Sequence, residues 1–319
     1  MKGVKKAAAI LGGTALIAGA GSAYGAYTLY KRVIPRQMEN RVDLNEMADM
    51  AQWEEYKKII HANKDWLSER EMEHLTIKSR DGLTLHGDYI PADEDADTIV
   101  ICFHGYTSNG WDSCSSVAAF FLREGYDCLV VDNRAHGKSE GAYVGFGILD
   151  RFDCLCWMNY VNERFDFKKN IVLYGVSMGA ATVVMASGFK KLPKNLKAII
   201  SDCAFTSPYD VFAHILKRDY HLPEFPVMNF NDMLTKKTAG YGFKDYSTLN
   251  AVTKTSIPIL FIHGEKDDFV PTEMSYRNYN ACNSPCELLI VENAGHAAAY
   301  YENVPLYEKK VKEFLNKYL

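Results

Sequence analysis

The stretch Ile171-Val-Leu-Tyr-Gly-Val-Ser-Met-Gly-Ala-Ala-Thr-Val-Val-Met-Ala-Ser187 decides how this chain is expected to fold. Its first four residues form a short apolar run typical of a buried strand, and the residues from Met178 onward are typical of a helix. Between them lies the pattern Gly175-x-Ser177-x-Gly179. A turn sharp enough to lift a serine above a sheet is strained and leaves room only for small residues on either side. The sequence therefore predicts a strand, a tight turn that exposes Ser177, and a helix.

Short apolar runs and helical patterns alternate on both sides of this stretch, and a hairpin pattern around Arg80-Asp-Gly82 comes first. Strands separated by helices form crossover units, so the pattern predicts an α/β fold. Its sheet should be mostly parallel, with helices on both faces and the hairpin at one edge. Eight strands are expected, over residues 74–79, 83–90, 98–103, 127–131, 171–174, 198–201, 257–262 and 288–291, and helices over residues 115–123, 146–165, 178–187 and 305–319.

More than fifty residues between Asp202 and Ile257 interrupt this alternation, because no strand pattern occurs there. The segment is rich in Tyr and Phe. A long excursion within a compact domain is usually functional or disordered, and aromatic density argues against disorder. A small helical cap over a pocket is therefore predicted at about residues 204–256.

A serine hydroxyl needs an adjacent base to act as a nucleophile at neutral pH, and that base is commonly a histidine held by a carboxylate. The carboxyl ends of parallel strands open on one edge of a sheet, so loops after different strands meet there. His296 follows the last predicted strand and is the expected base. Three candidate acids also follow strands, namely Asp267 and Asp268 after the seventh strand and Asp202 after the sixth.

Acyl transfer also needs N–H donors for the negative charge that develops on the carbonyl oxygen. At a strand–turn–helix nucleophile, one donor is the backbone N–H of the residue after the serine, here Met178. The second should come from the loop after the third strand, His104-Gly-Tyr-Thr-Ser-Asn109, where the backbone N–H of Tyr106 is the expected donor. His104 is expected to stabilise this turn rather than to react.

The first 36 residues differ from the rest of the chain. Ala7–Tyr30 is 24 residues long and has no charge, and basic residues flank both of its ends. A helix of that length spans the hydrocarbon core of a membrane. We expect a single-pass anchor within residues 1–36, which would place the protein at the cell membrane, in contact with the lipid bilayer. A cleaved signal peptide, which would give a secreted protein, and a buried helix are the alternatives. The basic residues at both ends leave the orientation open.

Residues 37–72 are charged, and their apolar side chains recur at spacings of three and four, which predicts an amphipathic helical connector before the α/β domain of residues 73–319.

Over the whole chain, 36 Lys and Arg oppose 40 Asp and Glu. That net charge of −4 argues against a nucleic-acid partner. None of the eight cysteines has the spacing of a zinc site, whereas Cys282 and Cys286 are close enough in sequence for a local disulfide.

Five motifs, in this order and spacing, resemble the α/β-hydrolase superfamily: HGYTSN at 104–109, DNRAHGKSEG at 132–141, GVSMG at 175–179, HGEKDDFVP at 263–271 and NAGH at 293–296. The resemblance covers residues 73–319. It is nearest to bacterial hydrolases grouped with serine aminopeptidases and prolyl-oligopeptidase-like proteins, many of which have an N-terminal membrane segment and a small cap. The resemblance implies the α/β-hydrolase fold and places the triad acid at the fifth position of HGxxDxxVP, here Asp267. Ala135 departs from the family, which often has glycine at that position.

The residues and the resemblance together predict a membrane-associated serine hydrolase that cleaves an ester or related acyl bond of a small molecule, without a metal or cofactor. Peptidases share these motifs with esterases, thioesterases and lipases. An exopeptidase acting on short peptides is therefore the alternative, with Glu224, Asp232 or Asp245 holding a free amino terminus. A catalytically inactive, membrane-anchored interaction protein is disfavoured, because the serine, the histidine and both glycines are present. The oligomeric state stays open.

Overall fold

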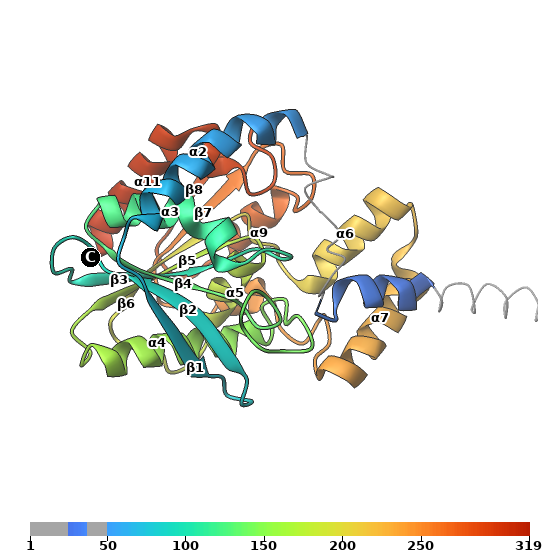
Figure 1. The fold of residues 1–319 in the computed structure, drawn as a ribbon. Coiled ribbons are helices and arrows are strands. Elements are labelled where there is room, and N and C mark those ends of the chain that lie inside the picture. The colour runs from blue at the N-terminus through green and yellow to red at the C-terminus, as the bar shows by residue number, and fades with distance from the viewer. Residues whose placement is uncertain (1–24, 37–49) are drawn as a thin grey trace, which may run out of the picture.

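The computed structural model describes residues 25–36 and 50–319 of the chain. An eight-stranded sheet runs through it in the order β1-β2-β4-β3-β5-β6-β7-β8 (Figure 1). β2 pairs with both β1 and β4 in antiparallel fashion, and all the other neighbours are parallel, which confirms the predicted sheet. The strands are β1 (Glu73–Lys78), β2 (Thr84–Ile90), β3 (Thr98–Phe103), β4 (Asp127–Val131), β5 (Asn170–Val176), β6 (Leu196–Asp202), β7 (Ile259–Gly264) and β8 (Cys286–Val291).

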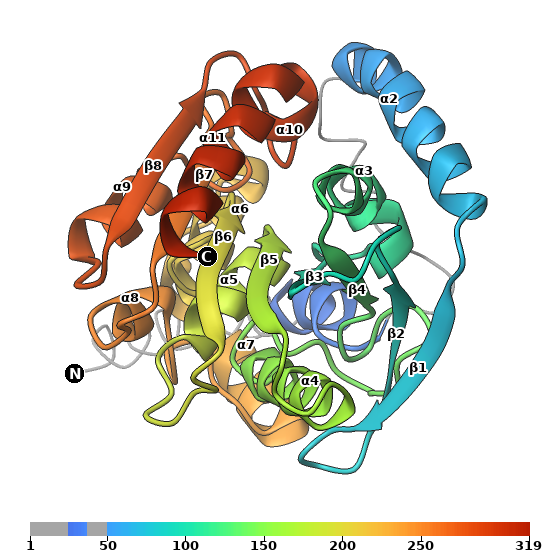
Figure 2. The same ribbon diagram turned by 90° about the vertical axis from the view of Figure 1, so that its left-hand side faces the viewer.

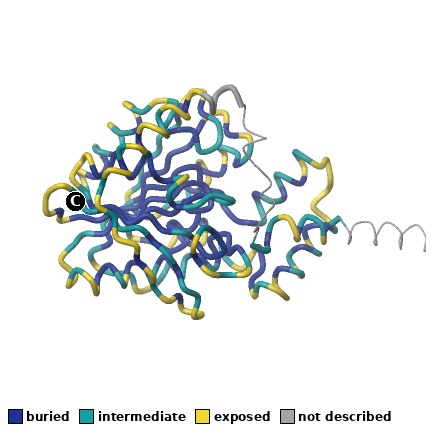
Figure 3. Tube along the Cα trace, viewed as in Figure 1, coloured by how far each residue is buried: buried dark blue, intermediate teal, exposed yellow. Residues whose placement is uncertain are grey.

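Helices cover both faces of this sheet (Figure 2), which is why its central strands are apolar on both sides. Every residue of β3, β4 and β7 is buried, and the buried residues follow the strands in Figure 3. One face packs against α2, α3 and α11 around Phe121 and Phe314, and the other against α4 and α5 around Trp157 and Val183. The named helices are α2 (Met50–Ser68), α3 (Gly110–Arg123), α4 (Asp150–Arg164), α5 (Met178–Ala186), α6 (Pro208–Tyr220), α7 (Glu224–Ala239), α8 (Thr248–Val252), α9 (Glu273–Ala281), α10 (Ala299–Glu302) and α11 (Val304–Tyr318).

All eight predicted strands are present, with ends within two residues of those expected, but some helices differ. α3 begins at Gly110, five residues before the predicted start, because the Asn109 side chain caps it there. α4 begins at Asp150 rather than at Phe146, because Phe146 and Gly147 have φ values of 46° and 81°, which a right-handed helix excludes. α9 was not predicted, since its mainly polar sequence shows no helical apolar period.

The predicted cap region, residues 204–256, contains α6, α7 and α8. α6 and α7 lie beyond the end of the sheet, beside a helix that covers residues 25–33 (Figure 1). We refer to the latter as the N-terminal helix. The Tyr30 hydroxyl donates to Thr238 Oγ1 at 2.6 Å, which joins this helix to α7. Ala26, Val211 and Met228 belong to one apolar cluster that fills the space between these three helices.

Residues 1–24, which carry most of the predicted membrane anchor, and residues 37–49 of the predicted connector lie outside the described part of the chain. Along residues 25–36 and 50–319, no helix combines the length and the apolar character that crossing a membrane requires. Ala26, Tyr30 and Ile34 are buried against the cap. The last residues of the uncharged stretch Ala7–Tyr30 therefore pack on protein.

Candidate active site

Ser177 lies in the turn between β5 and α5, with φ of 54° and ψ of −113°. A positive φ is uncommon for a residue that carries a Cβ atom, and it marks local strain. The flanking glycines allow this turn. A Cβ atom on Gly175 would lie 2.3 Å from the carbonyl oxygen of Gly179, and one on Gly179 would lie 2.1 Å from that of Phe103. The turn therefore presses so closely on its surroundings that neither glycine has room for a side chain.

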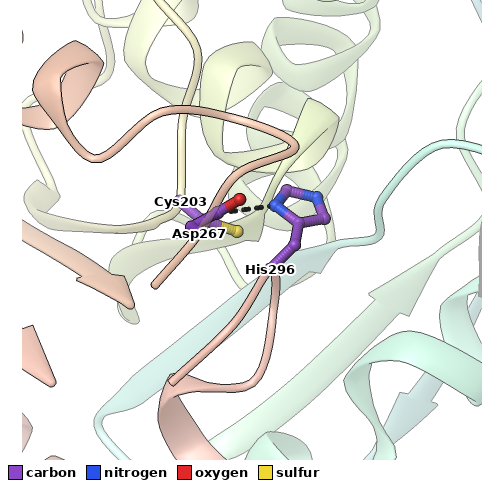
Figure 4. A group of neighbouring side chains, drawn as sticks. All are labelled: Cys203, Asp267 and His296. Carbon is purple, nitrogen blue, oxygen red and sulfur yellow. Dashed lines mark hydrogen bonds and ion pairs between the residues drawn. The ribbon is translucent and has the colours of Figure 1, made fainter. Parts of the chain in front are cut away.

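Three side chains named from the sequence come together at this turn. The Ser177 hydroxyl lies 2.9 Å from His296 Nε2. On the other side of the ring, His296 Nδ1 lies 2.7 Å from Asp267 Oδ2, the contact that is drawn in Figure 4. Nδ1 faces a carboxylate and so carries the ring proton, which leaves Nε2 to accept the hydrogen bond from the Ser177 hydroxyl. Loops after β5, β7 and β8 supply the three residues, as expected for one edge of a parallel sheet.

The Asp267 side chain is completely buried and is held by hydrogen bonds at both carboxylate oxygens. Oδ1 accepts the backbone N–H groups of Phe269 at 3.1 Å and Val270 at 2.9 Å. Oδ2 faces His296 and also lies 3.0 Å from His263 Nε2. Burial alone would raise the pKa of the Asp267 carboxyl, but the charges and hydrogen bonds of His296 and His263 outweigh burial and lower it. The carboxylate is thus kept ionised, as the orientation of a histidine base requires.

His263, the first residue of HGEKDDFVP, also belongs to this site, although its sequence setting predicts no role for it. It is fully buried, and its Nε2 lies 2.8 Å from the carbonyl oxygen of Val270 as well as near Asp267. Nε2 faces two acceptors and therefore carries the proton, while Nδ1 accepts from the Ser275 hydroxyl at 2.6 Å. The signal available in the sequence was a histidine at the end of an apolar strand, because a buried polar ring there needs partners.

The other two candidate acids lie elsewhere, and of the three, all within the described residues, Asp267 alone contacts His296. Asp202 is buried, and its Oδ2 accepts the Tyr307 hydroxyl at 2.9 Å. Its backbone carbonyl oxygen accepts the N–H of Ser177 at 2.8 Å, so it helps to fix the turn. The Asp268 side chain is 80% exposed and faces Arg218.

The loop of residues 104–109, which we call the oxyanion loop, adjoins Ser177. A Cβ atom on Gly105 would lie 3.5 Å from the Cβ of Ser177, and Tyr106 is the next residue. Met178 is the first residue of α5, where backbone N–H groups have no acceptor within the helix. Both predicted oxyanion donors therefore belong to segments that border the serine.

Two histidines stabilise the oxyanion loop. His104 Nδ1 donates to the carbonyl oxygen of Gly105 at 2.6 Å, and its Nε2 accepts the N–H of Asn133 at 2.9 Å. His104 thus stabilises the turn, as the sequence analysis expected. His136 Nε2 accepts the N–H of Thr107 at 3.3 Å.

Comparison with known proteins agrees with this architecture. The sequence profile of the alpha/beta hydrolase fold matches residues 98–226, from β3 into α7. The uncharacterised protein YqkD of Bacillus subtilis is 31% identical over 242 residues, which cover 76% of this chain and 78% of YqkD. The chain belongs to the alpha/beta hydrolase fold family. An uncharacterised membrane protein of Saccharomyces cerevisiae is 24% identical over 214 residues, covering 66% of this chain and 68% of the yeast protein.

Solved structures of alpha/beta hydrolases cover most of the chain. The esterase Pf2001 of Pyrococcus furiosus is 25% identical, with a TM-score of 0.63 over 78% of this chain and 93% of the esterase. The acylaminoacyl peptidase of Pyrococcus horikoshii is 18% identical, with a TM-score of 0.57 over 77% of this chain and 41% of the peptidase. The likeness to the peptidase shows a shared alpha/beta hydrolase fold alone.

Cys203 lies beside Asp267 and His296 in this alpha/beta hydrolase, and the three ligand-type atoms fall within 4.8 Å of one another (Figure 4). Burial raises the pKa of the Cys203 thiol well above its ordinary value, whereas a metal binds the thiolate. The 2.7 Å between His296 Nδ1 and Asp267 Oδ2 is also shorter than the roughly 3.3 Å that separates two ligands of tetrahedral zinc. The geometry fits a hydrogen-bonded pair beside a neutral thiol better than a set of metal ligands.

All eight cysteines are free thiols, including Cys282 and Cys286.

Apolar and aromatic side chains connect the oxyanion loop to the cap. The Tyr106 ring lies 5.0 Å from that of Phe146, which lies 4.8 Å from Phe212, and Phe212 lies 5.0 Å from Phe243. A small cavity of about 60 Å³ adjoins these rings, and Val33 of the N-terminal helix lines it together with Phe212 and Phe243. The cap side of the site is therefore apolar.

Proposed function

We propose that this alpha/beta hydrolase is a serine hydrolase that cleaves an ester or related acyl bond. The observation that carries the proposal is the continuous hydrogen-bonded series from Ser177 through His296 to Asp267. A hydroxyl that contacts a base, which is in turn oriented by a carboxylate, is the arrangement that activates a serine. The similarity to the P. furiosus esterase agrees with this proposal.

In the proposed mechanism, Ser177 Oγ attacks the acyl carbonyl carbon while His296 Nε2 takes the hydroxyl proton. The charge that develops on the carbonyl oxygen is stabilised by the backbone N–H groups of Met178 and Tyr106. His296 then gives its proton to the leaving alcohol, and the acyl group stays on the serine. Water, deprotonated by His296, attacks this acyl-enzyme. The bond between the acyl group and Ser177 Oγ then breaks, His296 returns the proton to Oγ, and the acid is released. Asp267 stays ionised throughout and stabilises the protonated ring of His296.

We further propose that the acyl group is apolar. The aromatic series from Tyr106 to Phe243 supports this, because a charged acyl chain would lose its hydration there without gaining a partner. The peptidase alternative needs a carboxylate free to bind an amino terminus. Glu224 instead accepts the Tyr209 hydroxyl, and Asp232 and Asp245 accept backbone N–H groups of the turn after α7. These engagements favour the ester over the peptide as substrate.

We also propose that residues before Gly25 attach the protein to a membrane. Because residues 25–34 pack on the cap, Ala7–Tyr24 remains as an uncharged stretch of 18 residues. That length lies at the short end of what spans a bilayer. The yeast relative that is named a membrane protein adds support.

The experiment that tests the hydrolase proposal compares p-nitrophenyl esters of increasing chain length with aminoacyl p-nitroanilides. Wild-type protein should hydrolyse the esters, and Ser177→Ala should lose about 10⁴-fold or more of kcat. Ser187→Ala is the matched control, because among the described residues its buried hydroxyl donates to the carbonyl oxygen of Val184 in α5. An unchanged rate in Ser177→Ala would refute the proposal, and faster anilide than ester turnover would favour the peptidase.

A further inference from the structure

We propose that residues 30–36, at the end of the N-terminal helix, position the oxyanion loop, directly through the side-chain hydroxyl of Tyr106 and indirectly through His136. The proposal rests on the function proposed above, because it concerns how the backbone N–H of Tyr106 is held at the site. Figure 1 shows the N-terminal helix beside α6 and α7, far in sequence from the loop that follows β3. Contacts on two sides of the oxyanion loop carry the inference.

The first contact is direct. The Tyr106 hydroxyl lies 3.0 Å from the carbonyl oxygen of Val33 and 3.2 Å from that of Arg32. The last carbonyl groups of a helix receive no hydrogen bond from within the helix, and they lie at the negative end of its dipole. They therefore suit a phenol donor. Burial raises the pKa of Tyr106, which keeps its hydroxyl protonated and able to donate.

The second contact runs through a neighbouring loop, residues 132–147. Residues 34–36 form two backbone hydrogen bonds of 2.8 Å with residues 142–144. The Arg36 guanidinium adds hydrogen bonds to the carbonyl oxygens of Gly137, at 2.7 Å, and of Ser139. Arg36 thus links the end of the N-terminal segment to the turn around Gly137 and Ser139 in the 132–147 loop.

His136 passes this support from the 132–147 loop to the oxyanion loop. Its Nε2 accepts the N–H of Thr107, and its ring stands edge-on to that of Tyr106, with 6.0 Å between ring centres. Thr107 has φ of 60°, a conformation that a β-branched residue keeps only where its surroundings enforce it. Residues 30–36 therefore support Tyr106 directly and Thr107 through His136.

This support matters because an oxyanion donor works by being in place before the charge develops. Removal of one such donor costs about 10²–10³-fold in kcat. Loss of the Tyr106 hydroxyl would leave its N–H present but less well placed, so we expect a smaller loss. The loss should fall on kcat rather than KM, because the oxyanion exists only after the substrate is bound.

The test uses the full chain and compares Tyr106→Phe with Tyr89→Phe. Tyr89 is the matched control, since its hydroxyl donates to Asp127. Asp127 is the first residue of β4, at the end of the strand opposite to the 132–147 loop. With p-nitrophenyl butyrate, Tyr106→Phe should lose about tenfold or more in kcat with KM within about twofold of wild type. Arg36→Met should reduce kcat in the same direction, while Tyr89→Phe should not. A kcat for Tyr106→Phe within twofold of wild type would overturn the proposal.

Amide hydrogen exchange of residues 104–110 separates this proposal from the proposed function. Tyr106→Phe should exchange at least severalfold faster there, whereas Tyr89→Phe should match the wild type. If the wild type hydrolyses no ester, the proposed function fails, and exchange alone then decides whether residues 30–36 hold the loop. Unchanged exchange in Tyr106→Phe would show that they do not.

Discussion

At the scale of single residues, the proposed chemistry depends on the carboxylate that His296 contacts. Asp267→Asn would keep the shape of the side chain but could not stabilise a protonated imidazole, and it would favour the wrong tautomer. We expect kcat for ester hydrolysis to fall on the order of 10⁴-fold. Asp268→Asn is the matched control, because the Asp268 side chain is 80% exposed. It should change kcat less than twofold, and a larger loss there than in Asp267→Asn would mean that the acid is wrongly assigned.

Asp202 offers a residue-scale prediction about stability rather than rate. Burial raises the pKa of its carboxyl from 3.8 to about 6, and its Oδ1 has no hydrogen-bond partner among the described residues. The Asp202 carboxyl therefore holds its proton more tightly in the folded state than in the unfolded state. The carboxyl stabilises the fold most at low pH, and that contribution is lost as pH rises from about 4 to about 6.

The variant Asp202→Asn has no such titration. Relative to wild type, it should gain about 2 kcal/mol in the free energy of unfolding between pH 4 and pH 7.5. Urea unfolding across this range measures the difference. A difference between variant and wild type that stays constant with pH would show that Asp202 is not ionising in the folded protein.

Much of the residue-scale site could be predicted from the sequence, because a serine between glycines and a histidine after a strand have recognisable local settings. The choice among three acids could not be made from spacing, since adjacent residues such as Asp267 and Asp268 point in different directions. The resemblance to hydrolases selected Asp267, and the structure places that carboxylate against His296. His263 contacts Asp267 and Val270 because the loop after β7 turns back toward the end of its own strand. The residue type alone does not reveal such a turn.

At the scale of elements, β5, the turn at Ser177 and α5 form one unit that fits tightly against β3. Gly179→Ala would place a Cβ atom 2.1 Å from the carbonyl oxygen of Phe103, and backbone atoms cannot rotate away. We expect a loss of about 3 kcal/mol in the free energy of unfolding. Gly25→Ala is the control, because nothing lies within 4 Å of its Cβ position. Its effect should stay within about 1 kcal/mol. A Gly179→Ala variant as stable as wild type in urea unfolding would contradict this tight fit.

The strands were more predictable than the helices for a physical reason. Strands buried on both faces require continuous apolar runs, and such runs have sharp ends in the sequence. Helix starts depend on single capping residues and on local φ values. Asn109 therefore shifted the start of α3 and Phe146 that of α4. α9 is mostly polar and carries too weak a period to be found.

At the scale of the whole molecule, the N-terminal segment is proposed to have two parts with different environments. Full-length protein should sediment with membranes, whereas a chain beginning at residue 25 should stay in the supernatant and remain folded. A chain beginning at residue 39 should be less stable, because it loses the buried side chains of Tyr30 and Ile34. The burial of these two side chains contributes about 3 kcal/mol to the free energy of unfolding. Membrane fractionation and thermal unfolding check both expectations, and sedimentation of the chain beginning at residue 25 would place the anchor elsewhere.

The placement of the N-terminal helix could not be predicted from its sequence. Apolar residues favour removal from water, and both a lipid bilayer and an apolar cap provide that. In the sequence, Ala7–Tyr30 therefore reads as one segment. The cap supplies specific partners, such as Thr238 for the Tyr30 hydroxyl, and these become visible only when distant segments are brought together.

The most direct test of the central proposal is covalent labelling of the whole protein with a fluorophosphonate, followed by mass spectrometry of its peptides. These reagents trap a serine that an adjacent base activates. We predict one adduct, on Ser177, that is absent from Ser177→Ala and much slower to form in Asp267→Asn. Folded wild-type protein that takes no label, or that takes it on another residue, would contradict the assignment of Ser177 as the nucleophile.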